Sequence, residues 1–362
     1  MMEKTLPEVC IIQYGFPFDS SKFCSAEGVP LVRIRDVVRG YSETYTTEIA
    51  GENYIVNDGD LLIGMDGEFN IAYWKGGRAY LNQRVCRLIP REDVDRDYIF
   101  YYMPQALKAI EDATPFVTVK HLSAKQLSKI LIPLPDMREQ QRISAVLRSV
   151  DRVIAMRKKE LDELNNLVKS RFIELFGDPL IEDDRYPRVP LGSLAEVGSS
   201  KRIFEKEYVS EGIPFYRTKE IVELSKGNRI TTELFITKER YDEIRSEYGV
   251  PQKGDLLISA VGTIGVIWVV DGRNDFYFKD GNLLRVSATE KFVPEYLKHL
   301  LEALISAYKS EMSSGTAYAA LTISALKEMM VYDVPHAEQE QFAAFVEQTD
   351  KSKLCGKMEV AA

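Results

Sequence analysis

The sequence lacks the short glycine and proline patterns that hold nucleotides and methyl donors. No two of its 22 glycines are spaced i, i+2, so no G-x-G loop for a dinucleotide or S-adenosylmethionine is present, and no Gly-Lys pair lies in a phosphate-loop context. There is no Pro-Pro pair, which excludes the N-P-P-[YF] loop of an adenine methylase. No acidic residue lies two before a lysine, which excludes the [DE]-x-K core of common restriction nucleases. We therefore expect neither motor, methylase nor nuclease activity, and no cofactor.

Patterns for metal binding and membrane insertion are also missing. The four cysteines form no C-x-x-C pair, so we expect them to be reduced and structural, and we expect no metal site. The three histidines are dispersed, and none is assigned a catalytic role. The longest apolar run, near VGTIGVIWVV, is too short to span a bilayer, and the N-terminus MMEKTLPEV has no apolar signal region. We expect a cytoplasmic protein.

Acidic residues outnumber basic ones, which restricts the mode of nucleic-acid binding. Lys and Arg number 47 against 55 Asp and Glu, for a net charge of −8. This balance argues against non-specific adhesion to nucleic acid. It does not exclude a DNA-binding protein that concentrates its basic residues on one face.

What the chain does contain is a long internal repeat. Its 362 residues, 45% of them hydrophobic, are enough to bury two ordinary cores. In each copy a Gly-Asp turn feeds a buried strand, and a stretch of helical periodicity follows, so we expect an α/β or α+β domain in each half. The matching segments are GVPLVRIRDVV at 28–38 with GIPFYRTKEIV at 212–222, GDLLI at 59–63 with GDLLI at 254–258, Tyr98 with Tyr296 and the helical stretches that follow them, and IPLPDMREQQRISAVLRSVDR at 132–152 with YDVPHAEQEQFAAFVEQTDK at 332–351.

One uninterrupted helix is predicted between the two copies. No Pro or Gly falls between Asp136, which can cap the helix, and Phe176, and Gly177 followed by Pro179 is a stop signal. About 40 residues at 1.5 Å each make a rod of about 60 Å. Apolar residues recur along it in the seven-residue pattern of a coiled-coil seam, which needs a partner helix. The seam residues are Ile143, Leu147, Val150, Ile154, Leu161, Leu164, Val168 and Leu175.

These helix sequences resemble those of a known family. The IPLP entry, REQQRI and the RFIELFGDP ending are similar to the central conserved region of the specificity (S) subunits of type I restriction-modification systems, and the weaker copy resembles their distal conserved region. The resemblance covers essentially the whole chain. It implies an α/β (α+β) fold in which long helices form an antiparallel coiled-coil spacer between two repeated target recognition domains. The expected parts are a first target recognition domain at 1–132, the central helix at 133–180, a second target recognition domain at 181–332 and a short distal helix at 333–362.

The resemblance also implies a function without catalysis. Each target recognition domain would read one half of a bipartite double-stranded DNA site, and the helices would set the gap and dock methyltransferase (modification) subunits. Motor-nuclease (restriction) subunits would join them in host defence, and DNA methylation and cleavage would belong to these partners. The alternative is a degenerate or truncated copy that acts only as a protein-interaction scaffold, because the architecture alone fits both roles.

The distal helix is expected at about 337–354, far shorter than the central helix. Two explanations stay open. Either the rest of the central seam faces a partner subunit, or the chain is a truncated or recombined form with weakened methyltransferase docking.

DNA contact needs cations for phosphates and polar or guanidinium groups for base edges. For any single candidate a solvated surface role is the commoner alternative. The stretch 262–265, GTIG, is interpreted as a tight turn before a core strand rather than a phosphate-contacting loop. The DNA-binding candidates are Arg33, Arg35, Arg78, Lys120 and His121 in the first half, Lys201, Arg202, Arg217, Lys219, Arg273 and Lys279 in the second, and, more weakly, Tyr14, Tyr216 and Thr316.

Overall fold

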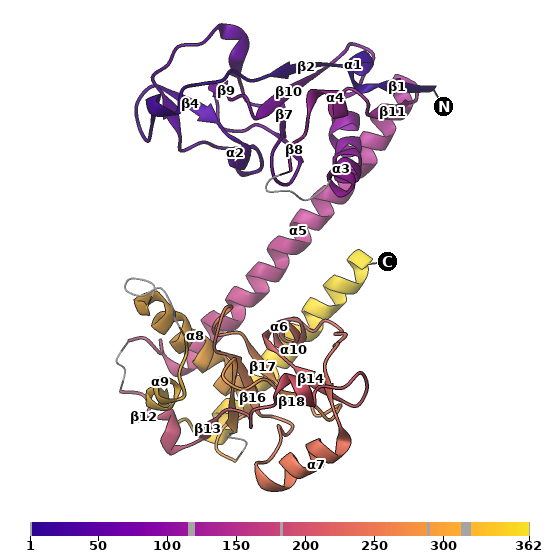
Figure 1. Ribbon diagram of the computed structural model, residues 1–362. Coiled ribbons are helices and arrows are strands. Elements are labelled where there is room, and N and C mark those ends of the chain that lie inside the picture. Colours follow the sequence, from indigo (N-terminus) through magenta and orange to yellow (C-terminus); the bar gives the residue numbers. More distant parts are fainter. Residues whose placement is uncertain (1, 115–119, 182–183, 288–289, 313–319, 362) are drawn as a thin grey trace. The chain divides into compact units, whose positions relative to one another are not determined.

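The computed structural model describes residues 2–114, 120–181, 184–287, 290–312 and 320–361 (Figure 1). The chain divides into two compact units, Met1–Ala155 and Met156–Ala362. Helix α5, Met137–Phe176, continues across this boundary as one helix of 40 residues, as predicted. Each unit has its own sheets and its own buried core.

A four-stranded antiparallel sheet and helix α3, Arg96–Ala113, enclose the main core of the first unit. Ile99, Met103 and Leu107 of α3 are fully buried because their four-residue spacing places them on one face of the helix. The helix begins at Asp95, whose carboxylate accepts a hydrogen bond of 2.9 Å from the N–H of Tyr98. The strand order is β2 (Cys10–Tyr14), β10 (Val85–Pro90), β7 (Leu61–Gly64) and β8 (Asn70–Tyr73).

A second sheet of five short strands completes the first unit. Its strands β4 (Val29–Val32) and β9 (Ala79–Leu81) are parallel, with Leu31 opposite Tyr80, whereas the other neighbours are antiparallel. Its strand order is β3 (Phe23–Cys24), β5 (Tyr45–Thr46), β4, β9 and β6 (Ile55–Val56). The unit also contains helices α1 (Leu6–Val9), α2 (Ile34–Arg39) and α4 (Ala124–Leu127), the 3-10 helices η1 (Ser20–Lys22) and η2 (Glu52–Tyr54), and the paired strands β1 (Met2–Thr5) and β11 (Leu131–Leu134).

The second unit repeats this plan. It has a four-stranded antiparallel sheet, and a smaller sheet whose strands β14 (Ile213–Tyr216) and β18 (Tyr277–Phe278) are parallel. The first sheet has the order β13 (Glu196–Gly198), β19 (Leu283–Ser287), β16 (Leu256–Ser259) and β17 (Ile267–Val269), and in the second β15 (Phe235–Ile236) precedes β14 and β18. The other elements are the paired strands β12 (Arg188–Pro190) and β20 (Met330–Tyr332), and helices α6 (Thr218–Ser225), α7 (Lys238–Glu247), α8 (Pro294–Met312) and α9 (Ile323–Glu328).

The two GDLLI copies form the same turn and the same buried strand. Gly59 and Gly254 have φ values of +87° and +93°, in the left-handed region that favours glycine. Their N–H groups donate to the carbonyls of Trp74 (2.8 Å) and Val270 (2.9 Å), which closes each turn against the neighbouring strand. The strands that follow, β7 and β16, are buried at every position, as predicted.

Two buried glutamines show how the helical repeats correspond. In α5 the Oε1 atom of Gln140 accepts from the N–H of Asp95 at 2.9 Å. In α10, His336–Ala361, the Oε1 atom of Gln339 accepts from the N–H of Val293 at 2.8 Å. Both side chains also donate to the carbonyl five residues before them, so α5 and α10 begin in the same way on their respective units.

Within the second unit, the end of α5 packs against the start of α10. The ring of Phe342 lies 5.3 Å from that of Phe172 and 5.7 Å from that of Phe176, and the Arg171 guanidinium lies over Phe345 at 6.0 Å. Residues earlier in α5 therefore contact residues later in α10. The two helices are antiparallel, as predicted.

Burial of the predicted seam differs along α5. Val168 is buried and Leu161, Leu164 and Leu175 are half-buried in the second unit, whereas Leu147 is 36% and Val150 48% exposed in the first unit. Ile143 and Ile154 are half-buried. The seam residues are therefore packed near the core of the second unit. Among the described residues, no side chain covers Leu147 or Val150.

The narrower estimate of 337–354 for the distal helix was wrong at its end. Helix α10 continues to Ala361 instead of ending near Leu354. A single glycine inside a helix costs only about 1 kcal/mol relative to alanine, so Gly356 does not end it. With 26 residues against 40, α10 is still the shorter helix.

Candidate nucleic-acid interface

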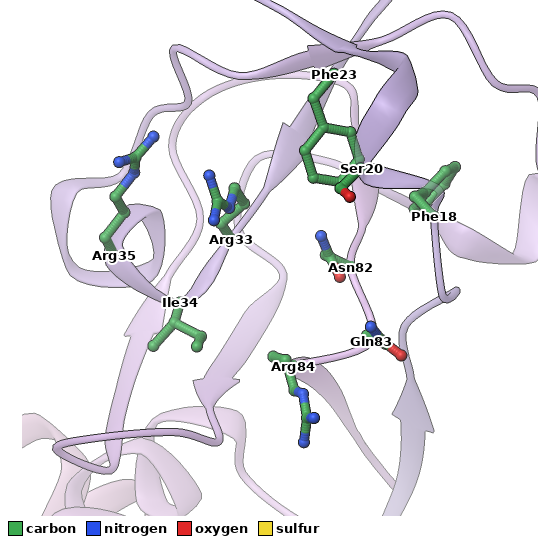
Figure 2. Close-up of a pocket in the computed structure, with 9 residues that line it drawn as sticks. All are labelled: Phe18, Ser20, Phe23, Arg33, Ile34, Arg35, Asn82, Gln83 and Arg84. Atoms are coloured by element: carbon green, nitrogen blue, oxygen red, sulfur yellow. The ribbon is translucent and has the colours of Figure 1, made fainter. Parts of the chain in front are cut away.

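The parallel pairing of β4 with β9 collects polar side chains at one edge of the smaller sheet in the first unit. Because parallel strands end at the same edge, the residues after β4 lie beside the residues after β9. Together with residues of the preceding loop they line a cavity of about 390 Å³ (Figure 2). The lining residues are Phe18, Ser20, Phe23, Arg33, Ile34, Arg35, Asn82, Gln83 and Arg84.

Arg33 and Arg35 supply positive charge to this cavity. Figure 2 shows Arg33 beside Phe23, and its guanidinium lies 5.9 Å from the centre of that ring. Arg33 has no carboxylate partner among the described residues. The Arg35 side chain is 58% exposed, with Nε 3.8 Å from the buried Asp36 carboxylate and a hydrogen bond of 3.2 Å to the Thr44 hydroxyl. Both guanidinium groups can therefore reach an anion in solvent.

The turn after β9 adds an amide pair and a third guanidinium. Asn82 is only 8% exposed, yet its amide makes no hydrogen bond to the described part of the chain. Gln83 is exposed, and its amide likewise has no partner there. Arg84 points away from Arg33 in Figure 2 and lies 3.5 Å from the Asp66 carboxylate, so this side chain is oriented.

His121 and Lys120 are placed differently from each other. His121 contacts the Asp66 carboxylate and lies 3.3 Å from Arg84, so it belongs to the same cluster. Lys120 is 18% exposed and donates to the carbonyl of Glu111 at 2.6 Å. That contact ties Lys120 to helix α3 rather than to solvent.

The second unit carries an equivalent group of charges at the edge where β14 and β18 end. Arg217 and the exposed Lys219 follow β14, and Lys279 follows β18, with its N–H donating to the carbonyl of Tyr216 at 2.9 Å. Arg202 donates to Asp280 at 2.8 Å, while the neighbouring Lys201 ammonium lies 4.8 Å from the Tyr248 ring.

Asp280 links the cations of this second group. Burial raises the pKa of its carboxyl, but the hydrogen bond from Arg202 and the charge of Lys279 together lower the pKa more, so it lies below its ordinary value. Asp280 therefore stays ionised near neutral pH and holds the 67%-exposed Arg202 in place.

The structure separates Arg78 and Arg273 from these groups. Each precedes its strand, Arg78 before β9 and Arg273 before β18, and so lies toward the other end of the parallel pair. Arg78 is paired with Glu52 at 2.9 Å and Arg273 with Asp271 at 3.4 Å.

Of the weaker candidates, Tyr216 is buried against Phe276, Tyr14 is half-buried, and Thr316 lies outside the described residues.

Sequence reasoning missed Asn82, Gln83 and Arg84. The repeat GVPLVR pointed to the residues after β4 but not to its partner strand. A parallel partner comes from a distant part of the chain, and nothing in the short stretch AYLNQR marks it as that partner.

The GTIG stretch is a structural turn. Gly265 has φ +85°, and a Cβ atom there would lie 2.7 Å from Cγ2 of Ile305. The N–H of Val266 donates to the Ser259 hydroxyl at 2.9 Å. These contacts support the interpretation as a tight turn.

Within the described residues, no group of three or more His, Cys, Asp or Glu side chains is placed to hold a metal ion. No described helix is both long and apolar enough to cross a membrane.

The chain consists of two units with one plan, each with a group of cations where its parallel strands end, and comparison with known proteins gives its family. The model of the type I restriction modification DNA specificity domain matches residues 1–166 and 185–356, and the chain belongs to this family. It is 30% identical to the type I restriction enzyme EcoBI specificity subunit of Escherichia coli, over 95% of this chain and 78% of that protein.

Other similarities agree with this assignment. A putative type I restriction enzyme specificity subunit of Haemophilus influenzae is 27% identical over 86% of this chain and 77% of that protein. The fold is similar to the crystal structure of the type I restriction-modification S subunit from M. genitalium, with a TM-score of 0.55 and 15% identity over 99% of this chain and 92% of that one.

Proposed function

We propose that this chain selects the DNA sequence on which a type I restriction-modification complex acts. Each unit reads one half of a split, asymmetric site, and the helices set the gap between the halves. The observation that carries this proposal is the repeated interface: cations follow a pair of parallel strands once in each unit, on the same scaffold but with different side chains beside them. DNA binding needs such a local concentration of cations in a chain of net charge −8.

The chain itself would catalyse neither methylation nor cleavage. Its relatives are called specificity subunits, and its sequence has none of the loops needed for ATP, a methyl donor or a nuclease metal. Methyltransferase subunits would dock on the helices, and motor-nuclease subunits would join them, in the cytoplasm. The apolar side chains of Leu147 and Val150 that α5 leaves exposed suit such a protein partner.

A domain exchange tests this function. We take residues 1–132 as the first recognition domain and 181–332 as the second, with helices at 133–180 and 333–362. Replacing residues 1–132 with the equivalent part of another such subunit should change one half of the methylated sequence and leave the other half intact. Methylation mapping of DNA from cells that carry the chain with its methyltransferase subunits gives the readout. A composite surface formed by both units would instead alter both halves, and a scaffold would direct no methylation.

A further inference from the structure

We propose that Gln83 and Arg84, in the turn after β9, read bases for the first unit, whereas Arg33 and its counterpart Arg217 contact phosphates. This inference rests on the proposed function, because it divides the interface of one recognition unit between the two kinds of DNA contact. It names the residues that determine which sequence the first unit selects.

The phosphate assignment follows from what the two units share. The N–H of Arg33 donates to Asp36 at 2.9 Å, and the N–H of Arg217 donates to Glu220 at 2.9 Å. Both carboxylates are buried, so the backbones of both arginines are held at the same place on the same frame. The Arg217 guanidinium also donates to the Glu220 carboxylate at 3.3 Å, whereas the Arg33 guanidinium has no carboxylate partner among the described residues. A contact common to both units cannot distinguish two different half-sites. It can hold the DNA backbone, which is the same in both.

The base-reading assignment follows from what the two units do not share. Asn82 and Lys279 begin equivalent turns, since their N–H groups donate to the carbonyls of Val32 (3.3 Å) and Tyr216 (2.9 Å), the last residues of the paired strands. Beyond that point the first unit has Asn-Gln-Arg and the second has Lys-Asp-Gly-Asn, at 279–282. Two domains that recognise different DNA sequences need the same backbone scaffold with different polar side chains, and these turns have that arrangement.

Side-chain chemistry indicates which bases the first unit takes. The exposed amide of Gln83 is free of protein partners among the described residues, and its donor and acceptor match the N6 and N7 edge of adenine. The Arg84 side chain is 51% exposed, with Nε 3.5 Å from Asp66 and Nη1 3.3 Å from His121, and the outward N–H groups of its two Nη atoms can offer two donors to the O6 and N7 edge of guanine. Asn82 lies deeper and lines the cavity. The half-site of the first unit therefore contains adenine and guanine, read from the major groove.

The test uses the full chain together with its methyltransferase subunits and a duplex DNA library in which both half-sites are randomised. Gln83→Ala and Arg84→Ala should each reduce discrimination at one base pair of the first half-site by roughly five- to a hundredfold. Arg84→Lys should behave like Arg84→Ala, because lysine keeps the charge but not the two-pronged geometry. Arg33→Ala should weaken methylation of all sequences and leave the preferred sequence unchanged.

Two internal controls make the outcome interpretable. The second half-site must stay unchanged in every variant, which shows that the second unit is intact, and the urea unfolding midpoint of the first unit, read through Trp74, must match that of the wild type. Arg91→Ala removes an arginine that follows the far end of β10 and donates to the carbonyl of Pro7 at 3.1 Å, so it should change neither half-site.

The results separate the two proposals. If the wild-type complex methylates no split sequence, the proposed function fails. If it does, and Gln83→Ala and Arg84→Ala keep the first half-site or change both halves, the assignment of bases to this turn is overturned.

Discussion

Leu147 of α5 and Val346 of α10 lie at equivalent positions, each seven residues after the buried glutamine that starts its repeat, yet Leu147 is 36% exposed and Val346 only 3%. The difference arises because Val346 belongs to a core that also contains Val168 and Phe172 from the end of α5. Among the described residues of the first unit, nothing covers Leu147 in the same way.

This difference in burial predicts different losses of stability when Phe342 of α10 and Leu147 of α5 are each shortened to alanine. Phe342→Ala should lower the free energy of unfolding of the second unit by about 3–5 kcal/mol, because it removes a fully buried ring. Leu147→Ala should lower that of the first unit by less than about 1 kcal/mol, since little buried surface is lost. The two tryptophans allow separate readings, with Trp74 in the first unit and Trp268 in the second. Urea unfolding followed by fluorescence, in Trp268→Phe and Trp74→Phe backgrounds, gives both values. Equal costs would show that another surface covers Leu147 in solution.

Burial predicts which thiols react. Cys10 and Cys86 are at most 1% exposed, and burial raises the pKa of both to about 12, so thiolate is scarce at pH 8. Cys24 is only half-buried, and its thiol lies at 2.9 Å from the carbonyl of Glu27. Iodoacetamide should therefore modify Cys24 in the native chain and reach Cys10 and Cys86 only after denaturation. Peptide mass spectrometry in a Cys355→Ser background measures this order. Native-state labelling of Cys86 as fast as that of Cys24 would contradict the buried placement.

The ion pair between Asp280 and Arg202 predicts a pH-dependent contribution to stability. The pKa of Asp280 is lower in the folded chain than its ordinary value, so the stabilisation is fully present above the unfolded-state pKa of about 4 and is lost as the pH falls through the folded value. Asp280→Asn should thus be less stable than the wild type at pH 7, by about 1 kcal/mol. The difference should shrink below about pH 4.

Urea unfolding between pH 3 and 7, followed through Trp268, measures this difference for Asp280. Asp242→Asn is the matched control, because Asp242 lies in the same unit, is exposed, and pairs with Lys238 at 3.7 Å within one helical turn. A gap between Asp280→Asn and the wild type that stays constant across this pH range would show that the pair does not stabilise the fold.

The parts of the fold that depend on local pattern could be predicted from the sequence. The 40 residues of α5 follow from the absence of breakers between its cap and Gly177, and the buried strands after Gly59 and Gly254 follow from their turn residues and apolar runs. The repeat also placed Arg33 and Arg217 in matching positions, because they stand in the same eleven-residue pattern.

The parts that depend on pairing between distant segments could not be predicted. The turn at 82–84 reaches Arg33 only because β9 pairs with β4 in parallel, and the sequence carries no signal for that choice of partner. The separation of Arg78 from Arg84, six residues later, has the same cause, since β9 runs between them. Helix α10 continues past the expected end near Leu354 because no proline follows Gly356 to stop it.

The length of α5 predicts the spacing of the DNA halves. Inserting seven residues after Lys159 keeps its apolar stripe in phase, because seven residues are close to two helical turns. The insertion lengthens the helix by about 10 Å at 1.5 Å per residue. It leaves the contacts of Phe172 and Phe176 with α10 in register, because these residues follow the insertion. DNA rises 3.4 Å per base pair, so the gap between half-sites should grow by up to about three base pairs while both half-sites stay the same.

The control for this insertion rotates the apolar stripe of α5 while lengthening the helix much less. Three inserted residues rotate the stripe by about 60° from its original direction and should cost assembly, because a helix turns by about 100° per residue. A partner helix that does not lengthen would absorb part of the shift, so an increase of one or two base pairs still fits a helix that sets the gap.

Methylation mapping of the assembled complex gives the gap directly. An active heptad variant whose methylated sites keep the original gap would show that α5 does not set the spacing, since its length would then have changed without any change in the DNA that is read.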